Sequence, residues 1–360
     1  MYFEQNRDKL LAQIDADVFM VVNLEDSDPS CMYYLSGFSG EGVLLVSAGD
    51  TVLITDRRYA ETARREVPGL TRVIIETEYA AETADILRQQ NYGRVGFASK
   101  RISYWFADKI ITASGADIVP MADPVAMVRM VKAPAEIEKI KASIQVMETA
   151  LGRVMEHVRT GMTEKEIAWA LEREMCEAGA TGPAFPVIVA AGENSALPHH
   201  QPGNRPLRNG DLLLCDIGAR LDGYCSDMTR VFSVGPPGER AKQMYKTVLN
   251  ARRKAMETIR PGRSGCSVDA AAFDVIIAAG YEGLIAHRLG HGVGLEVHEG
   301  PRLSPVNGET RLMENMILAL EPGIYDPGFG GIRIEDMVRV TRTCCELLTG
   351  YPGEELICVG

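Results

Sequence analysis

The segment 210–230, GDLLLCDIGARLDGYCSDMTR, places two carboxylates within strands that otherwise have a buried pattern. Asp216 interrupts the apolar run LLLCDIG, and Asp227 stands in the next segment, SDMTR. Such a strand excludes a carboxylate unless another group compensates for its desolvation. Asp222-Gly223 is a turn signal, so the segment predicts a β-hairpin that brings both carboxylates to one face. Two unpaired carboxylates would repel each other there, and a bound cation would remove the repulsion.

Three further polar residues stand in comparable positions beyond this hairpin. Glu321 follows the apolar run MILAL, Glu335 lies within GIRIED, and His291 lies in a glycine-rich segment. Taken singly, a strand carboxylate usually pairs with an arginine, here Arg333 or Arg230, and a loop histidine is usually structural. Five such residues within one half of the chain favour a shared site instead.

Four carboxylates and one imidazole form a hard, oxygen-rich set of ligands. The four negative charges match two divalent cations, and this donor set favours Mn²⁺, with Co²⁺ and Zn²⁺ as alternatives, over the ions that thiolates select. Two cations about 3.5–4 Å apart can share a bridging hydroxide and polarise a carbonyl group. The residues therefore predict a two-metal hydrolase.

Composition and charge argue against several other classes of protein. Of the 360 residues 46% are hydrophobic, which suffices for a large core and, by length, for two domains. The formal net charge of -11 argues against a nucleic-acid partner, because phosphate backbones repel an acidic protein. No apolar run approaches the roughly 18 residues of a membrane span, and the N-terminus does not resemble a signal peptide. The eight cysteines form no C-x-x-C pair, so we expect reduced thiols, no membrane association and a cytoplasmic location.

The first third of the chain has an α/β pattern and contains no histidine. GVLLVS (42–47) and TVLITD (51–56) flank a short turn and predict a hairpin. RVGFA (94–98) predicts a further strand, and the stretch SYWFADKIITA after it predicts a helix. This region holds no obvious cluster of catalytic residues.

A new pattern begins near Pro134, which suits the first turn of a helix. Apolar residues then recur at helical spacing, and Thr163 with Glu166 forms a capping box for a second helix. The segments that then predict strands are PVIVAAG, DLLLCDIGA, YCSDMTRVF, MILALEPGIY and GIRIEDMVRVT. Two helices at about 239–259 and 267–279 interrupt them, which is typical of an α+β domain. We expect an α/β domain at 1–124, a linker at 125–134 and an α+β domain at 135–360.

Several motifs of the second half occur in the order found in a known family. They are NSALPH (194–199), GDLLLCDIG (210–218), GYCSDMTR (223–230), HRLGHGVGLEVHEGP (287–301), ALEPGIY (319–325) and GIRIED (331–336). On these motifs the chain resembles the M24 metallopeptidases of the pita-bread fold, and within them the Xaa-Pro peptidases prolidase and aminopeptidase P. Residues 1 to about 124, with YYLSGFSGEGVLLVS and LITDRRYAETA, resemble the creatinase-type N-terminal domain.

The resemblance implies a role for each of the five polar residues. Asp216 matches the first aspartate ligand, and Asp227 matches the aspartate that bridges both ions. His291 is similar to the single histidine ligand. Glu321 resembles a ligand that also acts as general base, and Glu335 resembles the second bridging carboxylate.

The resemblance also implies catalytic and substrate-binding residues around the metal ions. His199 and His298 resemble histidines that steady the substrate carbonyl and the tetrahedral intermediate. His287 resembles a histidine beside the proline-side pocket, and Arg333 matches an arginine near the far end of the substrate. The family usually has a small residue directly after the histidine that matches His199, whereas this chain has His200 there. Either member of the pair at 199 and 200 is thus available to the site, and His199 is the better match.

The function implied is hydrolysis of Xaa-Pro bonds in short proline-containing peptides by a dinuclear metalloenzyme, as a prolidase or as an aminopeptidase P. The relatives are commonly homodimers, so we expect a homodimer here. One alternative keeps the metals and the scaffold but acts on a non-peptide amide or a small metabolite, as a hydrolase or a lyase. A second alternative is a pita-bread binding module without activity, which the presence of the complete ligand set disfavours.

Overall fold

The computed structural model describes residues 2–75, 78–306 and 308–360. The chain divides into two compact units, Met1–Arg129 and Met130–Gly360. The boundaries predicted from the sequence, with a linker at 125–134, stay a proposal. Within the described residues, no helix combines the length and the apolar character that a membrane crossing requires.

Unit 1 is built on a mixed sheet with strand order β4-β3-β2-β1-β5-β6. Its strands are β1 (Val18–Asn23), β2 (Gly42–Ser47), β3 (Thr51–Asp56), β4 (Thr71–Ile75), β5 (Arg94–Ala98) and β6 (Asp117–Met121). Its helices are α1 (Tyr2–Leu11), α2 (Pro29–Ser36), α3 (Ala60–Glu66), α4 (Tyr79–Gln89), α5 (Tyr104–Ser114) and α6 (Pro124–Arg129). The predicted hairpin is the antiparallel pair β2–β3, and the predicted strand and helix after it are β5 and α5.

Unit 2 is an α+β assembly of several small sheets between helices. Its helices are α7 (Pro134–Met155), α8 (Glu164–Glu177), α9 (Glu239–Thr258) and α10 (Gly265–Ala278), with the short helices η1 (Gly192–Ala196) and η2 (Glu282–Leu284). Its strands are β7 (Gly182–Pro183), β8 (Ile188–Ala191), β9 (Leu212–Ile217), β10 (Ala219–Leu221), β11 (Tyr224–Cys225), β12 (Met228–Val234), β13 (Gly290–Gly292), β14 (Glu299–Leu303), β15 (Ile317–Leu320), β16 (Gly323–Asp326), β17 (Gly330–Arg333), β18 (Asp336–Val340), β19 (Cys345–Leu347) and β20 (Ile357–Val359).

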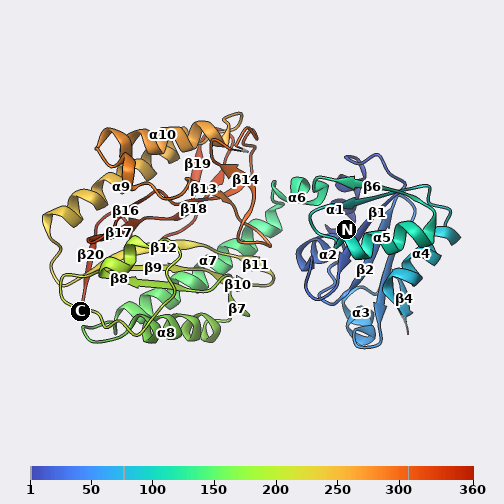
Figure 1. Cartoon of the computed structure of the whole chain (residues 1–360), viewed down its shortest axis with the longest axis horizontal. Coiled ribbons are helices and arrows are strands. Elements are labelled where there is room, and N and C mark those ends of the chain that lie inside the picture. Colours follow the sequence, from blue (N-terminus) through green and yellow to red (C-terminus); the bar gives the residue numbers. More distant parts are fainter. Residues whose placement is uncertain (1, 76–77, 307) are drawn as a thin grey trace. The chain divides into compact units, whose positions relative to one another are not determined.

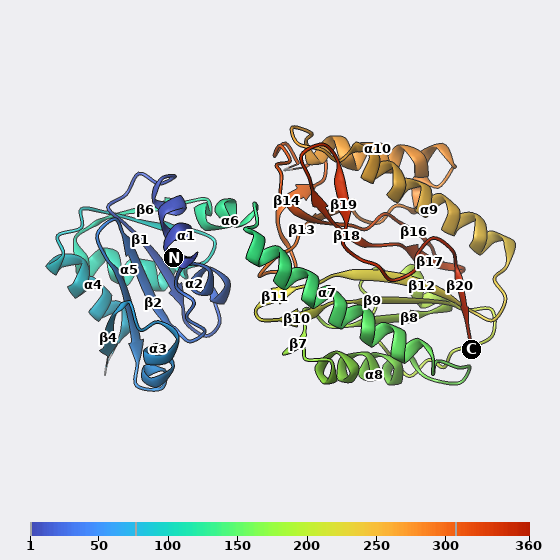
Figure 2. The same ribbon diagram turned by 180° about the vertical axis from the view of Figure 1, so that it is seen from behind.

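The four long helices of unit 2 cover its sheets from two sides (Figures 1 and 2). Helices α7 and α8 pack on the strands β7, β8, β10 and β11, whereas α9 contacts β16 and β17 and α10 contacts β14. The sheets between them have the strand orders β20-β12-β9-β8 and β14-β13-β15-β18-β19. Helix α7 begins at Pro134, and Thr163 and Glu166 form the capping box of α8, so both helix starts predicted from the sequence are confirmed.

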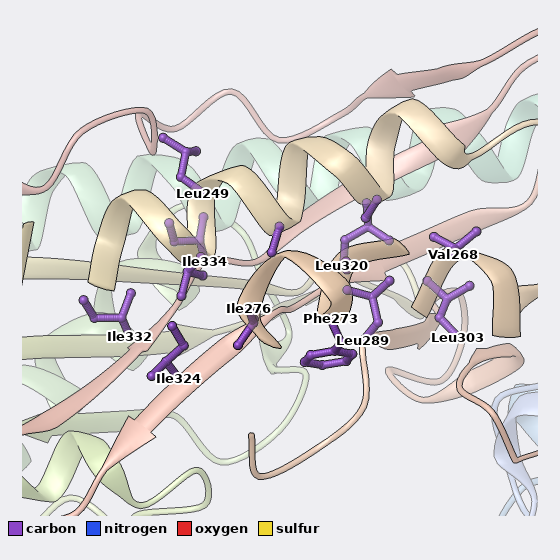
Figure 3. Packing of buried hydrophobic residues seen from close by; sticks show 14 of the residues in the cluster. Leu249, Val268, Phe273, Ile276, Leu289, Leu303, Leu320, Ile324, Ile332 and Ile334 are labelled. Atoms are coloured by element: carbon purple, nitrogen blue, oxygen red, sulfur yellow. The ribbon is translucent and has the colours of Figure 1, made fainter. Parts of the chain in front are cut away.

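A continuous apolar core joins α9 and α10 to the strands beneath them. Figure 3 shows part of this cluster, in which Val268, Phe273 and Ile276 of α10 lie among side chains of the neighbouring strands. Leu320 belongs to the same cluster and is fully buried, directly before Glu321. Burial of such a side chain contributes roughly 1.5–3 kcal/mol. The core therefore fixes the strand ends from which the polar residues project.

The predicted hairpin at 210–230 is present, but each of its strands is broken in two. Strands β9 and β12 pair antiparallel with Asp216 opposite Thr229, and β10 pairs with β11. Asp222 and Gly223 both have positive φ angles, as the tight turn between β10 and β11 requires. Asp227 lies in the break between β11 and β12, two residues before Thr229. Side chains two residues apart in a strand share a face, so Asp216 and Asp227 are diagonal neighbours.

Two other segments expected as single strands are also divided. The stretch MILALEPGIY forms β15 and β16 in different sheets, with Glu321 in the break. The stretch GIRIEDMVRVT forms β17 and β18, again in different sheets, with Glu335 in the break. A proline follows Glu321, and proline cannot donate a ladder hydrogen bond, which explains the first break. Carboxylates at such breaks can turn away from their own sheets toward a common point.

Candidate metal centre and active site

One cavity of about 330 Å³ in unit 2 collects every site residue predicted from the sequence. Its lining includes Asp216, Asp227, His291, Glu321, Glu335, His199, His287, His298 and Arg333. It is completed by the segment Phe185–Ile188 and by residues 198–202. The lining thus combines a polar cluster with apolar and proline-rich walls.

Three of the five predicted ligands form a compact group. One ligand atom each from Asp227, His291 and Glu335 lies within 4.8 Å of the others, and all three side chains are buried. His291 Nε2 lies 3.7 Å from Asp227 Oδ2 and 3.6 Å from Glu321 Oε1, so Glu321 adjoins the same group. These separations leave room for a cation between the atoms but are too long for direct hydrogen bonds.

Asp216 reaches the cavity from near the end of β9 and is only 9% exposed. Its Oδ2 accepts a hydrogen bond of 2.5 Å from Arg333 Nη2, the arginine pairing that the sequence left open. Its Oδ1 is buried, and none of the described residues gives it a hydrogen-bond partner. A buried carboxylate oxygen without a partner is costly, and a cation at this oxygen would compensate for that cost.

The imidazole of His291 is oriented by the backbone. Its Nδ1 lies 3.1 Å from the carbonyl oxygen of Gly292, to which it donates in the tautomer that fits this geometry. The lone pair of Nε2 then faces Asp227 and Glu321, as a metal-binding histidine requires. Burial lowers the pKa of His291 to about 3, so the ring is neutral and available as a ligand at neutral pH.

The carboxylates raise one another's pKa values. Burial, followed by the charges of Glu335 and Asp216, raises the pKa of Asp227 well above its usual range, and the pKa of Glu335 is raised in the same way. Burial and the charge of Asp216 raise the pKa of Glu321 to about 8. Such a cluster cannot be ionised together without counter-charges. The donor set, the orphaned Asp216 oxygen and these shifts all fit divalent cations at this site.

Neighbouring side chains hold two of the ligands in place. The hydroxyl of Thr229 donates to Glu335 Oε2 over 2.7 Å and accepts from Arg333 Nε over 2.9 Å. Arg333 also donates from Nη1 to the hydroxyl of Tyr325 over 2.7 Å. Arg333 is 3% exposed, and in this structure it binds protein groups on all sides. Its predicted contact with substrate stays a prediction.

His287 is fixed through both of its ring nitrogens. Nδ1 lies 2.8 Å from the carbonyl oxygen of Arg288, and Nε2 lies 2.6 Å from the hydroxyl of Tyr325. Because Arg333 donates to this hydroxyl, Tyr325 donates its own proton to His287 Nε2. Burial lowers the pKa of His287 to about 4, which favours this neutral form. His287 therefore presents a neutral ring to the cavity.

The two adjacent histidines of the 191–203 loop differ in their surroundings. His199 is exposed at the cavity, whereas His200 Nε2 lies 2.9 Å from Oε2 of the buried Glu164. On the other side of the site, the ring of His298 lies at a tilt against that of His291, with 4.3 Å between centroids. Among the described residues, the ring of His200 thus has a side-chain partner and that of His199 has none, so His199 is the member of the pair that is available to the cavity, and its catalytic role stays a prediction.

A second cavity of about 320 Å³ adjoins the first and shares four of its residues. The shared residues are His287, His291, His298 and Glu321. The new walls include Arg288 and Arg302, both exposed, together with Ser304. Two guanidinium groups beside the reacting centre give this cavity a positive character suited to a carboxylate. Neither arginine was predicted as a site residue.

The sequence reasoning missed Thr229, Tyr325 and Glu164 as well. Each acts through contacts that join distant parts of the chain, and none interrupts an apolar pattern in the way that Asp216 does. A threonine two residues after Asp227, on the same face of the hairpin, was the one signal that could have been recognised.

Two family models match the chain. The model described as metallopeptidase family M24 matches residues 138–342, and the model described as creatinase/prolidase N-terminal domain matches residues 6–131. Both matches agree with the family and the fold expected from the sequence.

Individual relatives match over nearly the whole chain. A protein named Xaa-Pro dipeptidase from Pyrococcus furiosus is 35% identical over 333 residues, which is 91% of this chain and 93% of the relative. The solved structure of an X-Pro aminopeptidase from Thermotoga maritima superposes with a TM-score of 0.91 at 36% identity, covering 98% of this chain and 99% of the other. That of a Xaa-Pro dipeptidase from Bacillus anthracis gives a TM-score of 0.94 at 34% identity, covering 99% and 100%.

Proposed function

The chain belongs to metallopeptidase family M24, with a creatinase/prolidase N-terminal domain, and on that premise we propose that it is an exopeptidase that hydrolyses Xaa-Pro bonds with two bound divalent cations. The predicted fold, pita-bread with a creatinase-type N-terminal domain, and the predicted metallopeptidase class are confirmed by these matches. The observation that carries the proposal is the convergence of Asp227, His291 and Glu335 within 4.8 Å beside Asp216 and Glu321.

We propose that these five residues hold the cations and that Mn²⁺ is the preferred ion, since carboxylate-rich sites favour hard metals. In this assignment Asp227 and Glu335, together with Asp216, His291 and Glu321, would hold the cations. When bound, the cations polarise the scissile carbonyl and make water acidic enough to supply a nucleophile near neutral pH.

Glu321 is the proposed general base and acid. Its side chain is 21% exposed, which leaves it accessible from the cavity. Oε1 faces His291, whereas Oε2 lies 3.8 Å from His287 Nδ1. We place the transferred proton at Oε2, from which Glu321 can deliver it to the departing proline nitrogen.

The histidines around this carboxylate take supporting roles in the proposal. His298 and His199 donate hydrogen bonds to the oxygen that becomes negative when the carbonyl is attacked. The neutral ring of His287 packs beside the proline, and Arg333 fixes Asp216 and Tyr325 in position. Substrate thus enters a cavity in which the reacting groups are already oriented.

The proposal also includes the length of the peptide that the cavity accepts. A dipeptide presents a free carboxylate directly after proline, and the cavity walls with Arg288 and Arg302 suit such a group. This observation favours the dipeptidase over the aminopeptidase. The homodimer and the cytoplasmic location expected from the sequence also belong to the proposal, and analytical ultracentrifugation tests the assembly.

The experiment compares hydrolysis of Xaa-Pro, Xaa-Pro-Yaa and Xaa-Ala peptides by enzyme loaded with Mn²⁺, together with metal analysis. We expect about two ions per chain and cleavage of proline peptides only, with Xaa-Pro preferred. Cleavage of no peptide by a chain that binds two ions would favour the alternative of a non-peptide amide or metabolite substrate. A chain that binds no metal would instead support the inactive binding module.

A further inference from the structure

Glu164 is a buried carboxylate outside the metal centre whose hydrogen bonds converge on one loop of the cavity. It is the first residue of α8, and its side chain is fully buried. Oε1 accepts from the backbone N–H of Ala191 over 2.8 Å and from Asn194 Nδ2 over 2.9 Å. Oε2 accepts from the N–H of Gly203 over 3.0 Å and pairs with His200 Nε2 at 2.9 Å. One side chain thus fastens both ends of the segment 191–203.

This segment forms a wall of the active-site cavity. Its residues 198–202 line the cavity and include His199. The backbone of α8 makes two further contacts with its far end, since Lys165 N–H donates to the Gly203 carbonyl over 3.0 Å and Glu164 N–H donates to the Arg205 carbonyl over 3.2 Å. The position of the wall therefore depends on the first turn of α8.

His199 depends on this fastening more than His287 and His291 do. His287 and His291 each have a ring nitrogen bonded to a backbone carbonyl. Within the described residues, no hydrogen bond is found for the His199 ring, so the backbone of the loop decides where the ring lies. The residue next to it, His200, turns its own ring to Glu164.

The protonation state of Glu164 agrees with this role. Burial alone would raise the pKa of the carboxyl group, but the hydrogen bonds from Asn194, His200, Ala191 and Gly203 outweigh burial and lower it. The carboxylate is therefore ionised at neutral pH, and an ionised acceptor forms the stronger hydrogen bonds. The N-terminus of α8 further favours a negative charge at this position.

We propose that Glu164 and His200 form a positioning pair that holds His199 at the substrate carbonyl. The inference rests on the proposed function, in which His199 steadies that carbonyl. Where the family usually has a small residue, this chain places an imidazole that ties the loop to α8. Glu164 is not part of the cavity lining, and His200 lines the cavity but bonds to Glu164 through Nε2, so in this proposal both act through His199.

The test uses Glu164→Gln and His200→Ala in the full chain loaded with Mn²⁺. In Glu164→Gln, the side-chain amide would turn an N–H group toward backbone and side-chain donors that need an acceptor. His200→Ala removes only the bond between His200 and Glu164 and leaves the carboxylate in place. Glu166→Gln is the matched control, because Glu166 is an exposed carboxylate two residues along the same helix whose side chain, among the described residues, bonds to Thr163 alone. A Gln side chain still offers an acceptor to Thr163 and so keeps the capping box of α8. His200→Gln is the conservative variant, since its side-chain amide can still donate to Glu164.

The first readout is hydrogen exchange in the segment 194–203, which needs no substrate. We expect exchange to rise at least about tenfold in Glu164→Gln and His200→Ala, equivalent to about 1.4 kcal/mol of lost protection. In Glu166→Gln it should stay unchanged in this segment, and His200→Gln should recover part of the protection. Unchanged exchange in His200→Ala and in a folded Glu164→Gln would overturn the inference.

The second readout is kcat and KM on an Xaa-Pro dipeptide, with His199→Ala as the reference. We expect His200→Ala to lower kcat about tenfold while KM changes little, because the lost interaction acts on the transition state. The double variant His199→Ala/His200→Ala should be no slower than His199→Ala, and a further tenfold loss would show that His200 does not act through His199. If the wild-type chain cleaves no proline peptide, the proposed function fails, and the exchange measurement alone decides whether the pair holds the loop.

Discussion

Removal of the cations should make the stability of unit 2 fall as pH rises from 7 to 8.5. The cause is the cluster of Asp227, Glu321 and Glu335, whose carboxyl groups have raised pKa values in the fold. In the unfolded chain these groups ionise near their ordinary pKa values, which are 4.5 for Glu and 3.8 for Asp. Between the unfolded and the folded pKa, the folded state binds more protons than the unfolded state, so a rise in pH favours unfolding.

The size of this effect follows from the width of the pH interval. A carboxyl group that keeps its proton in the fold across 1.5 pH units contributes a loss of about 2 kcal/mol. Glu321, with a pKa of about 8, loses its proton within the interval and contributes a loss of about 1 kcal/mol, and the raised pKa values of Asp227 and Glu335 act in the same direction. The lowered pKa values of His287 and His291 make the stability rise with pH instead, but mainly below pH 6.5. We therefore expect a net loss of at least about 1 kcal/mol, which corresponds to a decrease of about 2–4 °C in Tm.

The assay is thermal unfolding of chelated and Mn²⁺-loaded protein at pH 7 and pH 8.5. Bound cations keep the carboxylates ionised, so the loaded protein should be more stable at both pH values and should lose the pH dependence. Asp227→Asn is the internal control, because it removes one of the carboxyl groups whose pKa is raised in the fold and should reduce the slope in the chelated form. A chelated wild-type chain whose Tm is equal at the two pH values, or equal to that of the loaded chain, would refute the reasoning.

Three further outcomes are expected. Glu321→Gln and Asp227→Asn should each lower kcat by several orders of magnitude while circular dichroism shows an intact fold in the presence of metal, and turnover at the wild-type rate would contradict the assigned roles. Arg302→Ala should raise KM for an Xaa-Pro dipeptide about tenfold but leave KM for the corresponding Xaa-Pro amide nearly unchanged, because only the dipeptide has a free carboxylate beside this residue. An equal change in KM for both substrates would count against the cavity with Arg288 and Arg302 as the binding site of the carboxylate. Leu320→Ala should lower the free energy of unfolding by about 2–5 kcal/mol in urea titrations, because Leu320 is fully buried in the core before Glu321. A loss below about 1 kcal/mol would mean that neighbouring core residues fill the space left by the shorter side chain.

The family, the fold class and the residue types of the site could all be predicted from the sequence. Asp216 and Asp227 were recognised because a carboxylate in an apolar strand is unfavourable without a compensating group. The turn at Asp222-Gly223 and the capping box at Thr163 were recognised because turn and cap chemistry involves residues only a few positions apart. These local rules also explain why the predicted helices and hairpins agree with the structure.

The strands were predicted less accurately where the site interrupts them. Periodicity marked MILALEPGIY and GIRIEDMVRVT as single strands, whereas the chain changes sheet at Glu321 and at Glu335. A change of sheet leaves the apolar pattern of the flanking residues intact, so the pattern does not reveal it. The breaks are the positions from which the two glutamates reach the cavity.

The sequence by itself thus determined which residues are the candidates for the chemistry and meet in one cavity, whereas only the tertiary structure decided what holds them in place. Arg333 bonds to Asp216 across 117 positions of the chain, and Thr229 bonds to Glu335 across 106. The bonds of Glu164 to the loop of His199, and the position of Arg302 beside the cavity, likewise depend on strands and helices that meet only in the fold. The physical reason is the range of the interactions: caps, turns and apolar periodicity act between near neighbours, whereas the support of an active site comes from segments that are brought together by packing.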